Sequence, residues 1–251
     1  MPMNVLASME NIDIENLILF EDNHLLVVNK PNNIPVQEDI TKDDDFLNIL
    51  KNYLKQKHNK PGNVFLGLIQ RLDRPTSGVM VFAKTSKAAA RLCQSLVEGE
   101  FEKKYLAIVL GSLKEPQGAL VHYLKKNSLT NTVSVVPQGT TDCKRAELSY
   151  KVLADLEKIS LLEVELVTGR SHQIRVQLSH IGHPVFGDAR YKGDVVKGAD
   201  LALHAYLLRF CHPVSKDTMT FIVYPKPDKD LWKRFDLEQL LHQQIYGSSL
   251  E

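Results

Sequence analysis

The chain has 251 residues, of which 43% are hydrophobic and 24% are charged, and its 31 basic and 30 acidic residues give a net charge of +1. This composition excludes a disordered chain, which would be poorer in apolar residues and further from neutrality. Because no apolar run approaches the ~18 residues of a membrane span and no secretory signal is visible, we expect a cytoplasmic protein without membrane association.

The charges are unevenly distributed along the chain. Residues 1–50 carry ten acids against two lysines, a balance of −8, so the remainder carries +9. A basic body with an acidic leader suits a polyanionic partner such as RNA, although many ordinary enzymes share this imbalance. The scattered cysteines Cys93, Cys143 and Cys211 predict buried free thiols rather than a disulfide framework or a zinc site.

Local patterns in the first third of the chain predict a hairpin and a helix. A short polar segment, 1–16, is expected to be a flexible leader. Apolar runs at 17–20 and 25–28 flank a polar turn and predict a β-hairpin, followed by a turn-rich loop over 29–35. Asp45 is predicted to cap a helix with apolar residues at helical spacing.

The rest of the chain reads mostly as strands. A continuous apolar run at 79–83 predicts a strand buried on both faces, and Ser86 is expected to cap a helix that extends to Val97. A further helix is expected after Ser171. Further strands are predicted at 104–110, 119–124, 132–136, 145–153 and 159–167, and a last helix at 228–241.

Strands in series with isolated helices indicate an α+β fold with a mixed, mainly antiparallel sheet. We expect one catalytic domain over 17–242, with two lobes around a central cleft, and a flexible tail over 243–251. Because the hairpin begins near residue 17, no separate N-terminal domain is expected.

The most informative loop is 70–78 (QRLDRPTSG), directly before the buried strand. Asp73 lies between Arg71 and Arg74, and opposite charge within ~4–6 Å favours an ionised carboxylate that can act as a nucleophile. The arginines could also engage phosphates. On composition alone, an ordinary Arg–Asp surface turn is the more frequent arrangement.

A second basic segment, 166–178, runs from a predicted strand into a helix. Arg170, His172 and Arg175 gather at the helix start, where the helix dipole and the side chains together favour an anion. A solvated basic face is the common alternative. His172, His180 and His183 lack the spacing and partners of a metal site, and no metal is expected.

Lys104 and Tyr105 begin a third candidate, in which a strand tyrosine could stack on a base beside a phosphate-binding lysine. Packing of the tyrosine in the core is the simpler interpretation of this segment alone. The sequence contains no Walker A loop, no GxGxxG and no GxSxG, so it supports neither a nucleotide cofactor nor a serine hydrolase.

Taken together, these segments change the interpretation. Residues 71–78 (RLDRPTSG) strongly resemble the catalytic signature of the RluA-type RNA pseudouridine synthases. Further resemblances occur in the family's order. They are found at 28–31 (VNKP), 104–107 (KYLA), 169–175 (GRSHQIR), 182–188 (GHPVFGD) and 203–205 (LHA), and the similarity spans about residues 17–225.

The resemblance implies a pseudouridine synthase catalytic fold and a role for each matching residue. Asp73 matches the catalytic aspartate, Tyr105 the tyrosine that stacks on the base, and Arg175 the arginine that pairs with the aspartate. Arg71 matches an arginine that occupies the stack vacated by the flipped base. Gln70 departs from the family, which usually has histidine there, and we expect it to have a supporting role.

The resemblance therefore implies an RNA pseudouridine synthase that isomerises specific uridines in ribosomal or transfer RNA and needs no cofactor. The small N-terminal RNA-binding domain carried by many relatives is expected to be absent, and a monomer is the default expectation. Arg71, Arg74, Lys104, Arg170 and His172 are the predicted RNA-binding residues. One alternative is a non-catalytic RNA-binding or ribosome-assembly module that uses the same basic cleft. Another is a hydrolase with an aspartyl nucleophile, for which no second carboxylate motif is found.

Overall fold

A computed structural model describes residues 13–38, 43–193, 199–226 and 231–245. Its first half contains a 3-10 helix η1 (Glu15–Leu17), strands β1 (Ile18–Glu21), β2 (Leu25–Lys30), β3 (Gly67–Leu68) and β4 (Ser77–Ala83), and helices α2 (Phe46–Lys57) and α3 (Ser86–Val97). Strands β5 (Glu102–Leu110), β6 (Gln117–Asn127), β7 (Thr132–Val136), β8 (Lys144–Asp155) and β9 (Ile159–Leu166) follow, and then helix α4 (Gln173–His180). The chain closes with β10 (Leu203–Cys211), β11 (Thr218–Ile222), a 3-10 helix η2 (Trp232–Arg234) and α5 (Leu237–Ile245).

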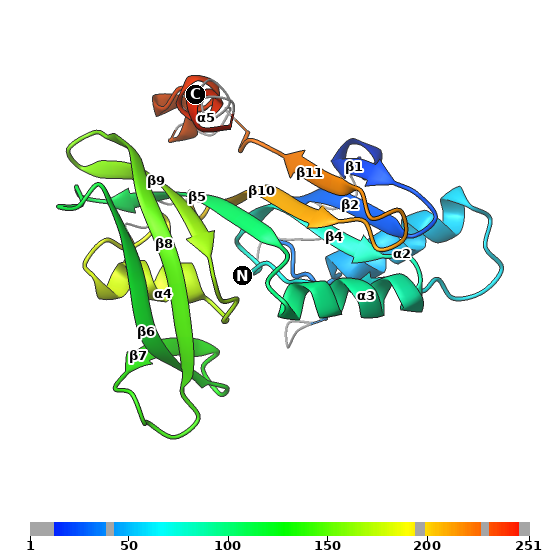
Figure 1. Cartoon of the computed structure of the whole chain (residues 1–251), viewed down its shortest axis with the longest axis horizontal. Helices are drawn as coiled ribbons and strands as arrows, with labels where there is room; N and C mark the ends of the chain where they lie inside the picture. The colour runs from blue at the N-terminus through cyan, green and yellow to red at the C-terminus, as the bar shows by residue number, and fades with distance from the viewer. Residues whose placement is uncertain (1–12, 39–42, 194–198, 227–230, 246–251) are drawn as a thin grey trace, which may run out of the picture.

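The strands of the described residues form one mixed sheet (Figure 1). Its order is β1-β2-β4-β10-β5-β9-β8-β6-β7, with β11 paired to β10 and β3 paired to β4. The pairing of β4 with β10 is parallel, and the other strand pairs are antiparallel. The predicted α+β fold with a mainly antiparallel sheet is therefore confirmed.

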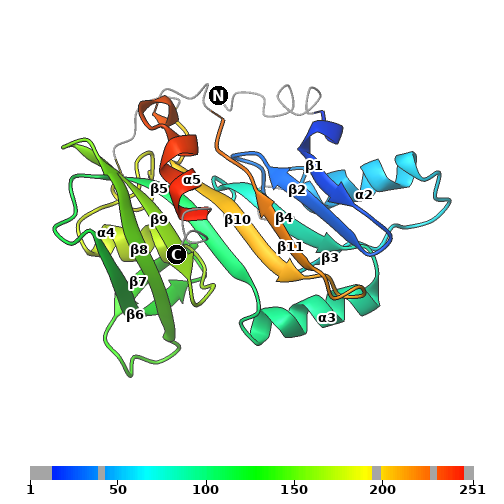
Figure 2. The same ribbon diagram turned by 45° about the horizontal axis from the view of Figure 1, so that its top comes forward.

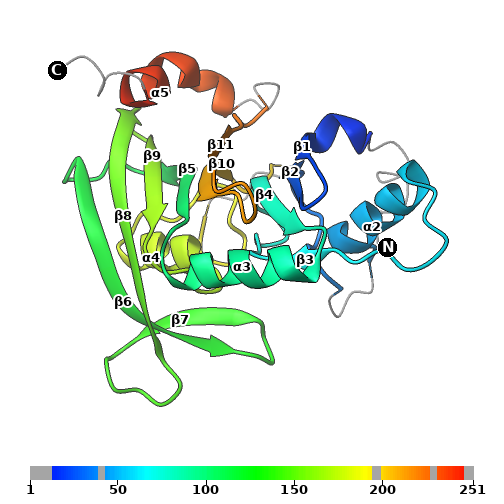
Figure 3. The ribbon, with the colours of Figure 1, turned by 45° about the vertical axis from the view of Figure 1, so that its right-hand side comes forward.

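The parallel pairing of β4 with β10 joins two groups of elements. The Asp73 half contains β1–β4, α2 and α3, and the Arg175 half contains β5–β9 and α4 (Figures 1 and 3). In Figure 2, α5 crosses in front of the sheet near β5, β9 and β10, whereas α4 lies behind β8 and β9. Within the described ranges, every helix is too short or too polar to cross a bilayer.

Strand β4 is buried on both faces, as its unbroken apolar run predicts. Val79 and Val81 pack in one hydrophobic cluster with Ala88 and Leu92 of α3. Met80 and Phe82 lie in the main core, which also contains Phe46, Leu50 and Leu54 of α2. Helices thus cover β4 on both sides and fix the position of the loop before it.

Several local predictions agree closely with the structure. The hairpin over 17–28 is present as β1 and β2, and Asp45 accepts a hydrogen bond from the Asn48 backbone N–H at 3.0 Å as the cap of α2. Five further strands were predicted from 104 to 167, and all five are observed as β5–β9. Alternating and continuous apolar patterns depend only on neighbouring residues, so the positions of these strands can be predicted from the sequence.

Other predictions need correction. The cap of α3 is Thr85 rather than Ser86, because the Thr85 hydroxyl accepts from the Ala88 N–H at 3.2 Å. The cap of α4 is His172, although Ser171 just before the helix offered a capping side chain. The His172 carbonyl accepts from the Val176 N–H at 2.9 Å, and its side chain makes no capping hydrogen bond.

The predicted C-terminal helix is interrupted. Residues 232–234 form a 3-10 turn, Phe235 is extended, and α5 begins at Leu237 after Asp236 accepts from the Gln239 N–H at 3.0 Å. Residues 227–230 of that prediction lie outside the described residues, as do 1–12 of the leader and 246–251 of the tail. Regular structure nevertheless occurs at 15–17 and continues to Ile245, past both predicted limits of the domain.

Three strands, β3, β10 and β11, were not predicted, and the thiols are not buried. The run at 203–211 is almost entirely apolar and shows no clear period, yet it forms β10 near the middle of the sheet and pairs with β11. Cys93 and Cys211 are exposed and Cys143 is intermediate, because Cys93 lies on the solvent side of α3 and Cys211 alternates outward at the end of β10.

Candidate active site

Asp73 lies on the loop before β4, and the Asp73 half holds this loop by its backbone. The Thr76 N–H donates to the Asp73 carbonyl at 2.9 Å and closes a turn. The fully buried ammonium of Lys30, at the end of β2, donates to the carbonyls of Pro31, Arg74 and Thr76 at 2.8, 3.1 and 2.8 Å. The loop therefore has a fixed course, whichever side chain stands at position 73.

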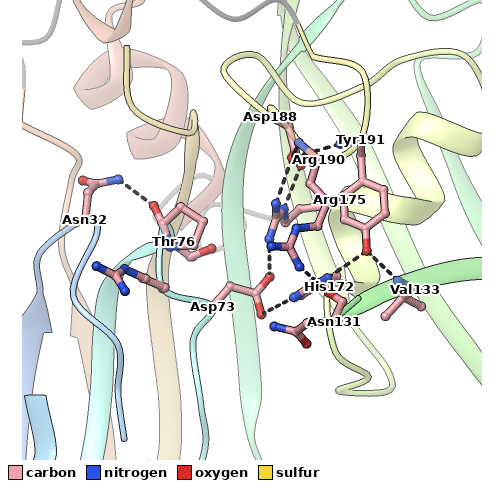
Figure 4. A network of polar contacts seen from close by, with 12 residues as sticks. Asn32, Asp73, Thr76, Asn131, Val133, His172, Arg175, Asp188, Arg190 and Tyr191 are labelled. Atoms are coloured by element: carbon pink, nitrogen blue, oxygen red, sulfur yellow. Dashed lines mark hydrogen bonds and ion pairs between the residues drawn. The ribbon is translucent and has the colours of Figure 1, made fainter. Parts of the chain in front are cut away.

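Arg175 of α4 reaches the carboxylate from the Arg175 half (Figure 4). Its NH1 group lies 3.1 Å from Asp73 Oδ2, across 102 residues of sequence. Its Nε and NH2 groups donate to the two oxygens of the fully buried Asp188 at 2.7 and 2.8 Å. The guanidinium thus bridges two carboxylates, one buried and one at the site.

The electrostatic environment keeps the Arg175 cation charged. Burial acts to lower its pKa, but the hydrogen bonds and charge of Asp188, followed by the charge of Asp73, raise it overall. The alternative of a solvated basic face does not hold for Arg175, which is only 5% exposed. A buried arginine with a fixed counterion is a directional donor for Asp73.

Tyr105 stands on β5 close enough for the Asp73 charge to affect its hydroxyl. Burial raises the Tyr105 pKa and the negative charge of Asp73 raises it further, so the phenol is neutral at pH 7. The ring is 7% exposed. The site therefore places a carboxylate, a guanidinium and a neutral phenol from three distant segments in one neighbourhood.

His172 is the fourth member of this group, which we call the Asp73 site: Asp73, Tyr105, His172 and Arg175. Its Nε2 lies 4.0 Å from Asp73 Oδ1, and its Nδ1 lies 2.8 Å from the Tyr191 hydroxyl. Figure 4 shows the Asp73 carboxylate directed between His172 and Arg175.

The other predicted RNA-binding residues lie around or away from the Asp73 site. Arg71 is exposed on the same loop as Asp73. Arg74 donates to the Asn33 carbonyl at 3.2 Å and pairs with Asp43 at 2.6 Å. Arg170 is exposed and donates to the Arg145 carbonyl at 3.0 Å.

Lys104 is not brought to the Asp73 site. Successive strand residues point to opposite faces, so Lys104 and Tyr105 lie on different sides of β5. The Lys104 ammonium is 3.3 Å from Glu163 and 3.7 Å from Glu102.

Sequence reasoning gave no role to Asp188 or Tyr191, which orient Arg175 and His172. Asp188 follows Gly187 at the end of the motif 182–188, and its place in that motif could have marked it as a site residue. Nothing local marks Tyr191. Among the described residues, no group of three or more His, Cys, Asp or Glu side chains is arranged to hold a metal ion.

Known proteins are similar to this chain over the region that contains the Asp73 site. The sequence model of one protein family, described as RNA pseudouridylate synthase, matches residues 24–180. The chain is 34% identical over 213 residues to ribosomal large subunit pseudouridine synthase D of Yersinia pestis, covering 78% of this chain and 63% of that protein. It is 33% identical over 232 residues to the protein of the same name from Vibrio parahaemolyticus, covering 86% of this chain and 69% of that one.

Two solved human structures have a similar fold. Human RNA pseudouridylate synthase domain containing 4 matches with a TM-score of 0.72 at 23% identity, over 96% of both chains. Human RNA pseudouridylate synthase domain containing 1 matches with a TM-score of 0.69 at 26% identity, over 95% of this chain and 98% of that one. The chain spans less than two thirds of the length of the Yersinia relative.

Proposed function

The chain belongs to the RNA pseudouridylate synthase family, and from that premise we propose that it converts uridine to pseudouridine in RNA, with Asp73 as the nucleophile. The observation that carries the proposal is the Asp73–Arg175 pair beside Tyr105. A protein that only binds RNA has no need of a carboxylate oriented by a buried guanidinium.

The reaction fits this set of groups. It breaks the N1–C1′ bond of uridine and forms a C5–C1′ bond, with no net oxidation or reduction. Asp73 supplies the attacking carboxylate, and Arg175 fixes its orientation through Oδ2. The neutral Tyr105 ring stacks on the uracil base, and the buried surroundings keep water from the cleaved intermediate.

The target base must leave its helix to reach Asp73. Flipping costs a few kcal/mol, which stacking on Tyr105 and insertion of a side chain into the vacated stack offset. Arg71 is suited to that insertion because it is exposed two residues before Asp73. Arg74 and Arg170 are proposed to contact phosphates nearby, whereas Lys104 faces the other side of the sheet.

Tritium release from RNA labelled at uridine C5 tests this proposal, because C5 loses its hydrogen when it bonds to C1′. We expect release by the native chain and a loss of at least ~1,000-fold in Asp73→Asn. Asp217→Asn, an exposed carboxylate between β10 and β11, is the matched control and should retain full activity. Equal release by the native chain and Asp73→Asn, or no release by either on any RNA, would refute Asp73 as the nucleophile.

The RNA class is proposed from the relatives. The Yersinia and Vibrio proteins are named for the ribosomal large subunit, so unmodified large-subunit ribosomal RNA is the first substrate to assay and transfer RNA the second. Binding of either RNA without tritium release would instead favour the non-catalytic module. Mapping pseudouridine in total RNA from a deletion strain identifies the position.

We also propose that the protein acts as a monomer in the cytoplasm. The Asp73 site is assembled entirely from one chain, which supports a monomer. An RNA substrate of the ribosome is met in the cytoplasm.

A further inference from the structure

The backbone of His172 is held in an unfavourable conformation. Its φ of 52° and ψ of 20° are left-handed, although it is not a glycine, and its side chain makes no capping hydrogen bond to α4. Such a conformation is unfavourable for a residue with a Cβ and persists where the surroundings impose it. Here it directs the imidazole toward Asp73, with only 10% of the side chain exposed.

The groups that face the two ring nitrogens favour one tautomer of His172. The Tyr191 hydroxyl oxygen accepts from the Val133 N–H at 2.8 Å, and its own hydrogen can be donated to His172 Nδ1, also at 2.8 Å. A hydroxyl that donates to Nδ1 leaves the imidazole hydrogen on Nε2. Nε2 is the atom that faces Asp73 Oδ1, and an N–H there suits a carboxylate whereas a bare lone pair would be repelled.

Tyr191 is itself held rigidly. Its N–H donates to Asp188 at 3.2 Å, and the Arg175 guanidinium lies over its ring at 5.2 Å from the centroid. Asp188 therefore supports both donors to Asp73, since it binds Arg175 directly and holds the tyrosine that orients His172.

We propose that His172 is a positioning residue for the reaction: as the neutral tautomer with its hydrogen on Nε2, it restrains Oδ1 of Asp73 while Arg175 holds Oδ2. This inference rests on the proposed function and deepens it. The 4.0 Å separation is longer than a hydrogen bond, so Oδ1 stays open to the substrate, and a shift of about 1 Å would form the bond. Once formed, this bond keeps the carboxylate from rotating.

The charges around His172 agree with a neutral ring. Burial lowers its pKa, and the positive charges of Arg175, Arg190 and Lys126 act in the same direction, while Asp73 opposes them. His172 therefore acts on Asp73 as a hydrogen-bond donor rather than as a counterion at pH 7.

Two substitutions of His172 test which of its ring nitrogens supports the reaction. The amide nitrogen of Gln lies near the position of Nε2, whereas the shorter Asn reaches only the position of Nδ1 and tolerates left-handed backbone. We expect His172→Asn to lower kcat by about 10- to 100-fold with KM unchanged, and His172→Gln to stay within about fivefold of the native chain. A rise in KM at unchanged kcat would overturn the proposal in favour of phosphate binding, and equal losses in both variants would overturn it in favour of a structural role.

A measurement on the folded native chain needs no activity. Nitrogen-15 NMR of labelled histidine should show His172 as the Nε2–H tautomer at pH 7.5, and Tyr191→Phe should shift that population toward Nδ1–H. An Nδ1–H tautomer in an active native chain would overturn this inference alone. Absence of tritium release from every RNA would instead refute the proposed function.

Discussion

The two halves that form the Asp73 site hold their residues by different means. In the Asp73 half, the loop is fixed through three backbone carbonyls. Lys30 binds those of Arg74 and Thr76, and the Asn32 amide binds that of Pro75 at 2.9 Å. In the Arg175 half, charged side chains orient one another: Asp188 binds the Nε and NH2 groups of Arg175 and leaves NH1 for Asp73.

This difference predicts which substitutions should affect mainly the stability of the fold and which should also affect the rate of the reaction. Backbone anchors determine where the loop runs, so changes to them should alter the fold first. A side-chain network determines the direction in which a donor points, so changes to it should lower the rate as well as the free energy of unfolding. Burial lowers the pKa of Lys30 to about 7, although the charge of Asp73 opposes this shift. The side chain that anchors the loop is therefore shielded from solvent.

The largest effect is expected in the Arg175 half, at Asp188. Asp188→Asn leaves the buried Arg175 cation without its main counterion and free to turn from Asp73, so we expect a loss of at least ~100-fold in tritium release. Removing one partner of a buried pair also costs about 3 kcal/mol in the free energy of unfolding. Urea unfolding and single-turnover kinetics measure the two effects separately.

Asp217→Asn, which removes an exposed charge, controls for net charge in both measurements. If Asp188→Asn unfolded at the same urea concentration as the native chain and kept its rate, the Arg175 half would not depend on this network.

The second-largest effect is expected on the stability of the Asp73 half, at Gly78. Gly78 has φ +120°, and a Cβ at this position would lie 2.2 Å from the Ala205 carbonyl oxygen on β10. Gly78→Ala must therefore strain the residue and push β4 from β10, and we expect the free energy of unfolding to fall by about 3 kcal/mol or more. Thermal or urea unfolding measures it.

Gly99→Ala is the matched control, because Gly99 also has positive φ, +80°, but a Cβ there meets nothing within 4 Å. Its cost should be about 1 kcal/mol. Equal costs at the two positions would show that the close approach of β4 and β10 is not what makes Gly78 necessary.

The third effect is a pH dependence of stability, expected at His204 on β10, the strand that lies between the two halves. Its Nδ1 accepts from the Ser77 hydroxyl at 2.7 Å and its Nε2–H donates to the Val223 carbonyl at 2.9 Å, so both nitrogens are used by the neutral ring. Burial lowers the pKa of His204 from 6.5 to about 4, although the bond to Val223 opposes this.

The unfolded chain therefore binds a proton at this histidine at a higher pH than the folded chain does. Its contribution to stability is complete above pH 6.5 and is lost as the pH falls toward 4, by about 3 kcal/mol at most. Urea unfolding from pH 7 to 4.5 should show a shallower decline in His204→Gln than in the native chain. Parallel declines would mean that His204 does not titrate differently in the folded state.

Short-range patterns account for what could be predicted of the fold. The hairpin, the helix capped by Asp45 and the buried strand β4 each depend on neighbouring residues, because turn chemistry, capping and periodicity act over a few positions. The position of β10 could not be read in this way. Its apolar run carries no period, and its place between β4 and β5 depends on strands far away in the sequence.

The candidate site divides similarly. The sequence by itself determined the loop that presents Asp73, the basic start of α4 and the tyrosine of β5, since each is a local motif with its own chemistry. Only the tertiary structure decided that Arg175 meets Asp73 across 102 residues, that Lys104 faces away, and that Asp188 and Tyr191 orient the donors. The reason is physical: motifs depend on bonded neighbours, whereas distances between side chains depend on strand order and packing across the whole sheet.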